Sequence, residues 1–348
     1  MTGKALNEFS GLEIEPLIAD RPAEPRDSSR LLVVNRGDGS LRDRSFSDLP
    51  ALLTPRDLLV LNTSRVWKAR LEAAKTTGGR CEVLLTSPLS ADRLSWNGLC
   101  RKVRPGQVLN CPGAVEARCL HSNPDGSYAF SFSAPLDEAY LAANGAVPLP
   151  QYILKARKKR GVSAPPDEDK YQTVYAAQPG SIAAPTAGFH FTPELLSGLQ
   201  AAGVKVARIT LHIGWGTFRM VRSQDPAAHV MLEEECEISP ETAAAINAHR
   251  AEGGRVIAVG TSSMRTLETF AAQDGAIRPG RAKAGLFIRP GYGFRTAGAF
   301  ITNLHVPDSA PLYMTAAFAG RNLLFKAYRH AVDGKYRFYS YGDSMLVL

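Results

Sequence analysis

The chain has 348 residues, of which 45% are hydrophobic, and its formal net charge is +8. So much apolar material excludes extensive disorder, and the length predicts two or three domains or one domain with a large insertion. No apolar run approaches the roughly 20 residues that a membrane span requires, and no secretory signal is recognisable, so we expect a cytoplasmic protein. The five cysteines form no C-x-x-C pair, which argues against a disulfide framework and against a structural zinc site.

The excess of positive charge favours an anionic partner, with nucleic acid as the first candidate, because neutralisation of phosphates dominates that kind of binding. The densest basic cluster is the run Lys155–Arg160. Gly161 and the pair Pro165-Pro166 follow it closely, so we expect a mobile loop here and not a long helix. Such a loop either is simply solvated or grips phosphate, and the sequence leaves both interpretations open.

Two short apolar runs, residues 30–35 and 58–62, predict buried strands near the start of the chain. The pattern changes between about Val66 and Ala146, where short alternating segments are separated by turn signals. One of these, Asn123-Pro124-Asp125-Gly126, predicts a β-hairpin. Because helical periodicity is weak throughout this stretch, we expect a small β-barrel or a folded sheet.

After about Tyr171, strands and helices alternate. Thr192-Pro193-Glu194 begins a helix that Gly203 ends, and Ser239-Pro240-Glu241 begins another that Gly253-Gly254 ends. The other expected elements are strands at residues 204–214, 255–260 and 299–305, a helix from about Thr261, one long amphipathic helix from Met314 to Asp333, and a last segment at 336–348.

Alternation of this kind predicts a mostly parallel sheet covered by helices, and the two early strands plausibly belong to the same sheet. The β-rich stretch is then an insertion. We therefore expect an α/β domain formed by residues 1–65 and 147–348, and an inserted β-barrel domain formed by residues 66–146.

Two stretches that combine small residues with a histidine are the most informative feature of the chain. They are Ala183–Thr192, with His190, and Thr210–Phe218, with His212. Glycine lets a ligand approach the backbone closely, and histidine moves protons near neutral pH. A single stretch of this kind would be explained best as a Gly-rich loop with an incidental histidine. Two in succession, each at the end of an apolar run, favour an active site.

Three predicted strands end in polar residues, at the edge where open parallel sheets bind their ligands. The turn around Thr261 offers backbone N–H groups at a helix start, which suits a carboxylate or a phosphate. Each residue taken singly has a plainer explanation, since Thr261 can cap its helix and Arg265 can pair with Glu268. Their convergence on one edge favours a ligand site, and the residues concerned are His212, Gly214, Thr261, Arg265, Glu268, Asn303 and His305.

Ahead of the first strand, Asp27 stands close to Arg26 and Arg30. Either arginine can clamp an anion with two hydrogen bonds, and a surface salt-bridge group explains the cluster equally well. Asp343, in Tyr341-Gly342-Asp343, is a candidate base or hydrogen-bond acceptor, or simply a turn residue. P-loop, dinucleotide-binding and H-E-x-x-H patterns are missing, which disfavours a Walker-type nucleotidase, a dinucleotide dehydrogenase and a zincin.

A family resemblance rests on segments that follow one another along nearly the whole chain. They are RDSSRLLV, PLPQYI, YQTVYA, AAPTAGFHFT, TLHIGWGTF, VGTSSMRTLE, FITNLHVP and YRFYSYGDSML. Together they resemble the S-adenosylmethionine:tRNA ribosyltransferase-isomerase family of queuosine biosynthesis. The PTAGFHF and YRFYSYGD segments are the most specific parts of this match.

The resemblance implies a three-layer α/β domain interrupted by a β-barrel, with the active site between them. It implies that S-adenosylmethionine acts as a ribosyl donor and that no metal is used. The acceptor would be 7-aminomethyl-7-deazaguanine at the wobble position of tRNA, and the products would be epoxyqueuosine-tRNA, adenine and methionine. We expect the protein to act on the anticodon stem-loop as a monomer.

The sulfonium of S-adenosylmethionine acidifies the neighbouring ribose 5′ protons, so a positioned base can remove one, open the sugar and expel adenine. General acid–base catalysis of this kind contributes roughly 10²–10⁴-fold. On this resemblance we assign proton transfer to His190 and His212, with Asp343 or Asp27 orienting one of them. Arg265 and the Thr261 turn would hold the methionine or phosphate end. The other residues assigned to S-adenosylmethionine are Arg26, Arg30, Thr186, Gly188, Gly214, Gly216, Thr217, Glu268, Asn303 and His305.

The chain departs from the family pattern at four motifs, and the β-rich stretch also looks shortened near residues 96–106. Thr63 stands where an N-D-T-R motif has its acid, and Leu232 stands where an M-H-S-E motif has its histidine. Gly298 replaces an acid, and Gln151 interrupts an L-P-P-Y-I motif. Two other functions therefore stay open: a divergent relative that uses S-adenosylmethionine on another acceptor, and a catalytically silent RNA-binding protein.

Overall fold

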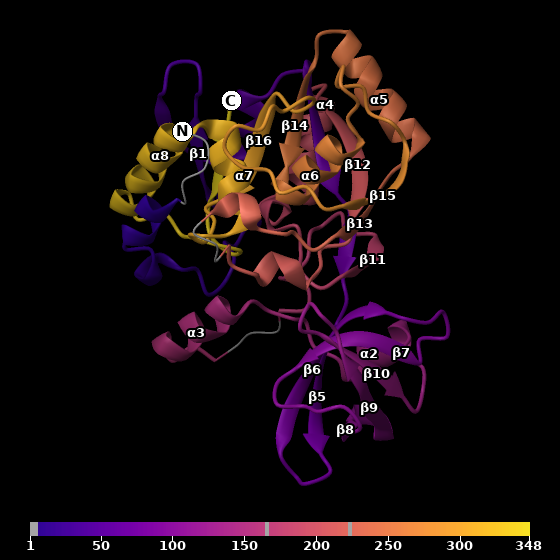
Figure 1. Cartoon of the computed structure of the whole chain (residues 1–348). Coiled ribbons are helices and arrows are strands. Elements are labelled where there is room, and N and C mark those ends of the chain that lie inside the picture. Colours follow the sequence, from indigo (N-terminus) through magenta and orange to yellow (C-terminus); the bar gives the residue numbers. More distant parts are fainter. Residues whose placement is uncertain (1–5, 164–166, 222–224) are drawn as a thin grey trace.

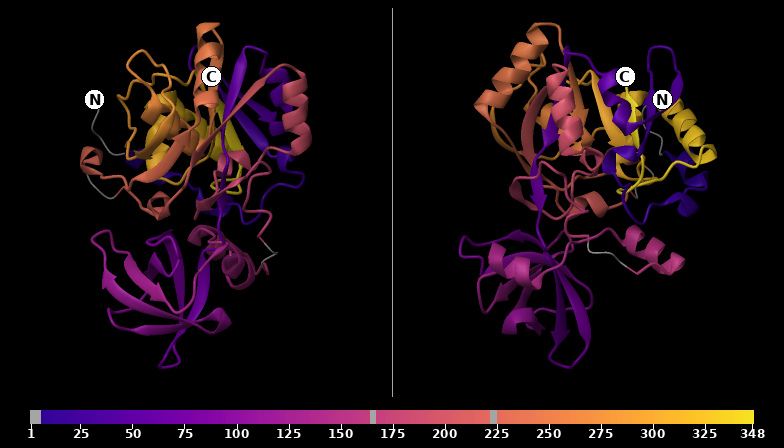
Figure 2. Two further views of the ribbon diagram at one scale, coloured as in Figure 1. Left: turned by 90° about the vertical axis from the view of Figure 1, so that its right-hand side faces the viewer. Right: turned by 180° about the vertical axis from the view of Figure 1, so that it is seen from behind.

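The structure, a computed structural model, describes residues 6–163, 167–221 and 225–348, and it consists of an α/β part and a β-barrel (Figure 1). The barrel lies at one side of the α/β part, as the views in Figure 2 also show. Its strands fall between Arg70 and Phe132, inside the stretch predicted as an insertion. The α/β class with an inserted barrel is confirmed, and the division at residues 66 and 146 stays a prediction.

The barrel is closed by six antiparallel strands. In spatial order they are β10 (Tyr128–Phe132), β7 (Ser95–Cys100), β6 (Arg80–Pro88), β5 (Arg70–Lys75), β8 (Val108–Cys111) and β9 (Val115–Ser122). The hairpin predicted at Asn123–Gly126 joins β9 to β10, which pair antiparallel. Helix α2 (Glu138–Asn144), capped by Asp137, then packs Leu141 into the barrel core.

Nine of the described strands form the large sheet. In spatial order they are β15 (Gly280–Ala284), β13 (Glu234–Ile238), β12 (Lys205–Leu211), β3 (Asp57–Asn62), β14 (Arg255–Val259), β16 (Ala299–Asn303), β17 (Ser344–Val347), β1 (Arg30–Val34) and β2 (Leu41–Ser45). The four strands from β12 to β16 are parallel to one another, whereas the pairs at both flanks include antiparallel ones. The sheet is therefore mixed, with a parallel centre. A separate parallel pair is formed by β4 (Ser64–Val66) and β11 (Gln178–Ser181).

Helices cover both faces of the large sheet. The side chains of Thr192 and Ser239 cap α4 (Pro193–Ala201) and α5 (Pro240–Ala251), as predicted. The other helices are α1 (Leu49–Leu52), α3 (Gln151–Arg160), α6 (Gly260–Phe270), α7 (Ala310–Ala319) and α8 (Arg321–Asp333). None of the helices in the described part of the chain combines the length and the apolar character that a membrane span needs.

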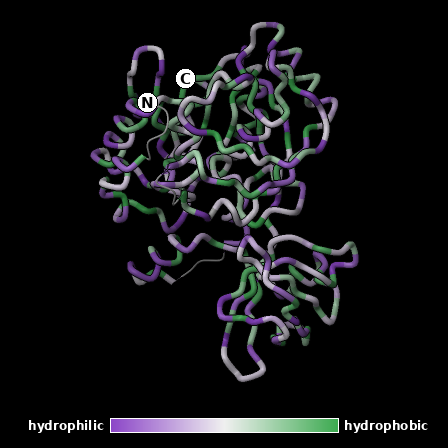
Figure 3. The backbone as a smooth tube through the Cα atoms, in the orientation of Figure 1, coloured by the Kyte–Doolittle hydropathy of each residue, from purple (hydrophilic) through white to green (hydrophobic). Residues whose placement is uncertain are grey.

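Alternating strand residues supply the two cores that hold these layers together. On β3, Leu58 and Val60 face the core shared with α5 to α8, while Leu59 and Leu61 face the core shared with α1 and α4. This is the period-2 pattern of a sheet buried on both sides. Hydrophobic segments accordingly gather in the middle of the α/β part (Figure 3). Helices, sheet and helices make up the expected three layers.

The basic run Lys155–Arg160 forms the second half of α3, so the prediction of a mobile loop was wrong. Gly161 ends the helix in the left-handed conformation, with φ 64°. The guanidinium of Arg157 is buried and donates two hydrogen bonds to the carboxylate of Asp167, one of them 2.8 Å long. Gly161, which suggested a loop, lies at the end of the helix and does not interrupt it, and Pro165-Pro166 lie outside the described residues.

The stretch from Met314 to Asp333, predicted as one helix, belongs to two helices, α7 and α8. Gly320 separates them with φ 86° and ψ 135°, a conformation that side-chain-bearing residues rarely adopt. The apolar periodicity continues through the glycine, whereas the backbone turns there. This turn places Tyr328 of α8 beside the strand-end residue His305.

Candidate active site

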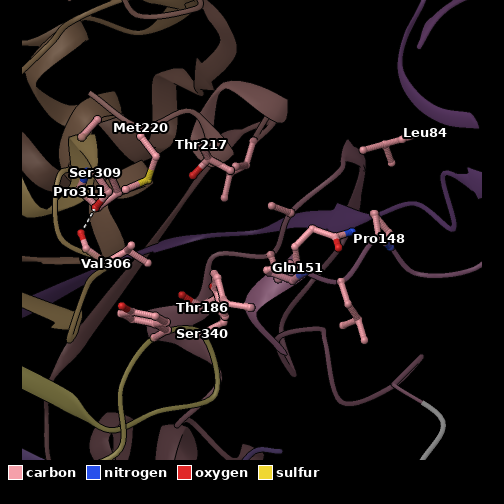
Figure 4. Close-up of a pocket in the computed structure, with 18 of the residues that line it drawn as sticks. Leu84, Pro148, Gln151, Thr186, Thr217, Met220, Val306, Ser309, Pro311 and Ser340 are labelled. Atoms are coloured by element: carbon pink, nitrogen blue, oxygen red, sulfur yellow. Dashed lines mark hydrogen bonds between the residues drawn. The ribbon is translucent and has the colours of Figure 1, made fainter. Parts of the chain in front are cut away.

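A cavity of about 960 Å³ lies between the barrel and the carboxyl ends of the central strands. That volume is within the range of small-molecule sites. The sheet side is lined by predicted site residues, namely Thr186, Thr217, Thr261, Arg265, Asn303 and His305. Figure 4 shows Thr186 and Ser340 on one side of this space, Met220 and Ser309 on another, and Gln151 and Pro148 toward Leu84 of the barrel.

Asn303, at the end of β16, is the centre of a directed hydrogen-bond chain. Its Nδ2 lies 3.3 Å from the carbonyl of Tyr339 and 3.4 Å from His190 Nε2, while its Oδ1 accepts from the Thr186 hydroxyl at 3.0 Å. A carbonyl only accepts, so the amide nitrogen must face Tyr339 and the amide oxygen must face Thr186. The Thr186 hydrogen is used in this contact, and its oxygen can still accept a hydrogen bond from a ligand.

His190 lies behind Asn303, with 3% of its surface exposed, and is not among the described residues that line the cavity. Its Nδ1 is 2.7 Å from the hydroxyl of Ser29. Burial, helped by the charges of Arg337 and Arg26, lowers the pKa of His190 to about 3. The imidazole is therefore neutral at pH 7. Because Asn303 donates to Nε2, the ring hydrogen is on Nδ1 and is donated to Ser29.

His305 is the histidine that lines the cavity itself. Its Nε2 is 2.6 Å from the hydroxyl of Thr302, and its backbone N–H donates to the Tyr328 hydroxyl oxygen at 2.6 Å. Burial lowers the pKa of His305 to about 3, so its ring is neutral at pH 7. Its position at the cavity wall makes this neutral imidazole a candidate proton acceptor, whereas a pKa so far below 7 makes it a weak base.

Arg265, on α6, is the buried cation of the cavity, with 9% of its surface exposed. It forms an ion pair with Glu234 of β13, whose other oxygen accepts from the backbone N–H of Gly214 at 2.7 Å. Burial lowers the pKa of Arg265 to about 10, which leaves it charged at neutral pH. Its buried Nε has no hydrogen-bond partner in the described part of the chain. A planar cation with a donor to spare suits a ligand carboxylate.

The first turn of α6 adds a second anion-binding element. Gly260, with φ +86°, turns the chain from β14 into the helix, and Thr261 and Ser262 line the cavity beside it. No side chain caps this helix start, so its backbone N–H groups remain available to an anion. Asn62 holds the turn from behind by donating to Ser262 Oγ at 3.1 Å.

His212 lies at a different cavity, of about 780 Å³, beside Arg208 and Glu235. Its neighbour Ile213 lines the first cavity. Side chains alternate along an extended chain, so the two residues point to opposite sides. The structure therefore does not bring His190 and His212 together at one site.

Asp343 contacts the arginine-rich start of β1 and not a histidine. Its carboxylate accepts from the backbone N–H groups of Arg30 and Arg337, at 3.1 and 2.7 Å, and also pairs with the Arg337 guanidinium. The Arg30 guanidinium stacks on the ring of Tyr336, 3.6 Å from its centre. These groups connect the N-terminal and C-terminal parts of the chain. None of them is among the described residues that line the cavity.

Arg26 donates to the backbone carbonyls of Gln172 and Asp169, at 2.6 and 2.7 Å, so its guanidinium is engaged within the protein. Asp27 is half-buried next to it in the short 3₁₀ helix Arg26–Ser28. Neither is among the described residues that line the cavity.

Glu268 does not pair with Arg265. Its carboxylate accepts from the Tyr292 hydroxyl at 3.1 Å and from the backbone N–H groups of Arg295 and Thr296. It therefore holds the loop that leads into β16. Burial raises the pKa of Glu268, against the lowering effect of these hydrogen bonds.

Two of the predicted glycines, Gly188 and Gly216, serve packing, whereas a Cβ on Gly214 would meet only ordinary contacts at 3.6 Å. A Cβ on Gly188 would come within 2.0 Å of the Tyr175 hydroxyl, and one on Gly216 would lie 3.0 Å from Leu232. Glycine is required where chain segments approach this closely. None of Gly188, Gly214 and Gly216 is among the described residues that line the cavity.

Three residues of the candidate site were not predicted from the sequence: Ser29, which contacts His190, Glu234, which pairs with Arg265, and Tyr339, which lines the cavity. Tyr339 lines the cavity with φ 74°, in the left-handed region where strain often marks a functional site. Ser29 and Tyr339 lie in the RDSSR and YSYGD segments, and Glu234 is the last residue of the M-L-E-E run, so the motifs contained a signal that composition did not. In the described ranges, no group of three or more His, Cys, Asp or Glu side chains is placed to hold a metal ion.

The fold and the candidate site define an α/β protein with an inserted β-barrel and a cavity between the barrel and the strand ends. A family model described as "Queuosine biosynthesis protein" matches residues 12–347. The S-adenosylmethionine:tRNA ribosyltransferase-isomerase of Symbiobacterium thermophilum is 46% identical over 99% of both chains. That of Acidithiobacillus ferrooxidans is 46% identical over 96% of this chain and 95% of its own.

A solved structure agrees with these sequence matches. The crystal structure of the S-adenosylmethionine tRNA ribosyltransferase from Thermotoga maritima covers 97% of this chain and 98% of its own, with 34% identity and a TM-score of 0.54. The chain therefore belongs to the S-adenosylmethionine:tRNA ribosyltransferase-isomerase family of queuosine biosynthesis enzymes.

Proposed function

We propose that the protein transfers the ribosyl group of S-adenosylmethionine to 7-aminomethyl-7-deazaguanine at the wobble position of tRNA and isomerises it. The products are epoxyqueuosine-tRNA, adenine and methionine. The observation that carries this proposal is the convergence of Arg265, Asn303 and His305 on one cavity between sheet and barrel. A cation, a directed polar chain and a neutral imidazole are the groups that a zwitterionic nucleoside and a proton transfer require.

Arg265 and the first turn of α6 are assigned to the methionine carboxylate. Arg265 has a donor without a partner in the described chain, and the turn offers N–H groups beside it. Together they offer an anion more donors than either alone. The adenosyl part then extends toward Thr186, whose oxygen accepts a hydrogen bond from a ligand N–H or O–H.

Proton transfer at the ribose is assigned to His305, because it is the histidine among the described residues that line the cavity. His190 acts as a positioning residue through Asn303 and does not touch the ligand. This replaces the pairing of His190 with His212 expected from the motifs. Asp27, Asp343 and His212 take no part in this assignment, since they lie outside the cavity lining of the described chain.

The positions that depart from the family motifs support ribosyl transfer to tRNA in preference to a reaction with another acceptor. Thr63 donates its hydroxyl to the Ile209 carbonyl at 3.1 Å, away from the cavity. Leu232 and Gly298 are also absent from the described residues that line it. Of the positions that depart within the four motifs, Gln151 alone is among the described residues that line the cavity, whereas the shortened stretch 96–106 contributes Leu99 to Lys102 to that lining.

The test is incubation of the protein with S-adenosylmethionine and tRNA that carries the aminomethyl-deazaguanine. Release of adenine together with a heavier tRNA supports the proposal. Adenine without that tRNA product indicates a divergent relative, and tRNA binding without turnover indicates a silent RNA-binding protein. Either of these results contradicts the proposal. A cytoplasmic location and a monomeric state stay predictions.

A further inference from the structure

The barrel wall of the cavity is basic. It includes Lys75 of β5, Arg80 of β6, and Arg101 and Lys102 after β7. Glu82 is the one carboxylate among the described residues that line the cavity, and it lies 3.4 Å from Arg70. The alternation of β6, in which Val83 and Leu85 are buried in the barrel, points Glu82 and Leu84 outward. The outer face of the barrel thus continues the cavity as a basic groove.

Three of these cations have no partner within the part of the protein that the structure describes. Arg80, Arg101 and Lys102 are exposed, and their side chains form no ion pair or hydrogen bond there. Charges that stabilise a fold are usually paired or hydrogen-bonded. An exposed cluster of one sign instead raises the local concentration of an oppositely charged partner.

The groove is too long for one small ligand. Leu84 lies on the barrel side of the cavity, beyond Pro148 and Gln151 (Figure 4). Leu84 is four residue steps along β6 from Arg80, which corresponds to about 13 Å. A nucleoside whose carboxylate is held at Arg265 cannot also neutralise Arg80. An extended polyanion can.

Helix α3 brings more positive charge to the cavity mouth. Gln151, which lines the cavity, shares one helix face with Lys155 and Lys158, at i+4 and i+7. Both lysines are exposed, and no partner of either side chain is found in the described ranges. Ile153 and Arg157 lie on the opposite face and are buried. The helix is fixed to the domain by one face and presents cations from the other.

We propose that the basic groove, formed by Arg80, Arg101, Lys102, Lys155 and Lys158, binds the sugar-phosphate backbone of the substrate RNA while the target base enters the cavity. Phosphate contacts position an RNA without reading its sequence, and base readout is left to the cavity. The identity of the RNA as tRNA rests on the proposed function, whereas the charge argument does not.

The experiment compares the triple variant Arg80→Ala/Arg101→Ala/Lys102→Ala with a control that removes three exposed cations elsewhere, Arg42→Ala/Arg44→Ala/Arg118→Ala. Binding of tRNA is measured by fluorescence anisotropy over a range of salt concentrations, and binding of S-adenosylmethionine by calorimetry. Because all six side chains are exposed, folding should be kept, and circular dichroism checks this.

We expect the groove variant to bind tRNA at least tenfold more weakly at 0.1 M salt. The slope of log affinity against log salt should fall by about two, since three phosphate contacts at roughly 0.7 each are lost. Lys155→Ala/Lys158→Ala should lower the slope by about 1.4 for the same reason. The control should stay near the wild-type affinity, and all variants should bind S-adenosylmethionine normally.

The two proposals fail in different ways. If the wild type releases adenine and the groove variant binds tRNA with the wild-type affinity and salt dependence, the groove does not bind the RNA backbone, and the proposed function stands. If the groove variant loses tRNA binding but the wild type transfers no ribosyl group, the assignment of the groove to RNA binding stands and the proposed function is wrong. An equal loss of tRNA affinity in the control variant contradicts the assignment of the groove to RNA binding, because net charge alone would then explain the binding.

Discussion

The two walls of the cavity use polar residues in opposite ways. On the sheet side Thr186, Asn303 and His190 are joined in one directed chain, and two of them are almost fully buried. On the barrel side Arg80 and Arg101 are exposed and without partners in the described chain. A fixed chain recognises one small ligand by geometry, whereas exposed charges attract a polyanion over a distance and are sensitive to salt. One cavity can therefore bind a nucleoside through fixed hydrogen bonds and an RNA through exposed charges.

The largest effect should come from His305→Ala, which removes the neutral imidazole from the sheet wall. We expect the rate of adenine release to fall by roughly 10²–10⁴-fold, the usual contribution of a general acid–base group. His330→Ala, at the surface ion pair with Asp43, is the matched control and should keep the wild-type rate. A single-turnover assay measures both. A His305→Ala rate within a few-fold of the wild type would remove this residue from the mechanism.

Arg265→Lys tests the clamp on the same wall. Lysine keeps the charge beside Glu234 but loses the planar donors of the guanidinium, so KM for S-adenosylmethionine should rise by about 10- to 100-fold, with a smaller change in kcat. Arg255→Lys, which replaces the partner of Asp57 at the remote end of β14, controls for the substitution itself. Unchanged KM in Arg265→Lys would show that the carboxylate binds elsewhere.

The buried state of His190 predicts a pH dependence of stability. Its pKa is about 3 in the folded protein and near 6.5 without the fold, so the unfolded chain binds a proton first as pH falls. The stability linked to neutral His190 is complete above pH 6.5 and is lost progressively down to about pH 3. Between pH 8 and pH 5 this amounts to about 2 kcal/mol.

Urea unfolding of the wild type and of His190→Gln at these two pH values measures this contribution. The variant has lower stability at pH 8 but should lose about 2 kcal/mol less on going to pH 5. His305 titrates in the same direction and is present in both proteins, so it cancels in the comparison. Identical losses in the two proteins would mean that His190 is not held neutral by the fold.

The smallest expected effect is a change in tRNA affinity when the barrel wall of the cavity is altered. Glu82→Gln removes the carboxylate from among the groove cations and should tighten tRNA binding by about two- to threefold at low salt, as a single exposed charge is worth less than about 1 kcal/mol. Glu116→Gln, on the exposed face of β9, is the control. Binding of S-adenosylmethionine should not change in either variant. Weaker tRNA binding by Glu82→Gln would contradict the assignment of the groove.

The sequence predicted the sheet wall well for a physical reason. Thr261, Arg265, Asn303 and His305 follow parallel strands, and the carboxyl ends of such strands meet at one edge. His212 also follows a strand, but the alternation of side chains turns it to the other cavity. The position of Ile213 in a buried run contained that information, since neighbours in an extended chain face opposite sides.

Contacts between distant parts of the chain were beyond the reach of local patterns. Ser29 meets His190 across 161 residues, and Asp343 meets the start of β1 across 313. Neither pairing has a local signature, so the carboxylates were assigned to the histidines by residue type alone. The helix at Lys155–Arg160 was missed because the breakers beyond its end were given more weight than its own residues.

The central claim is that S-adenosylmethionine binds between the two walls, and a crystal structure of the complex tests it most directly. We expect the carboxylate at Arg265 and the first turn of α6, the adenosyl part beside Thr186, and the ribose 5′ carbon within reach of His305. Density for the ligand in the cavity beside His212, or side chains that leave no room for it next to Asn303, would contradict binding between the two walls.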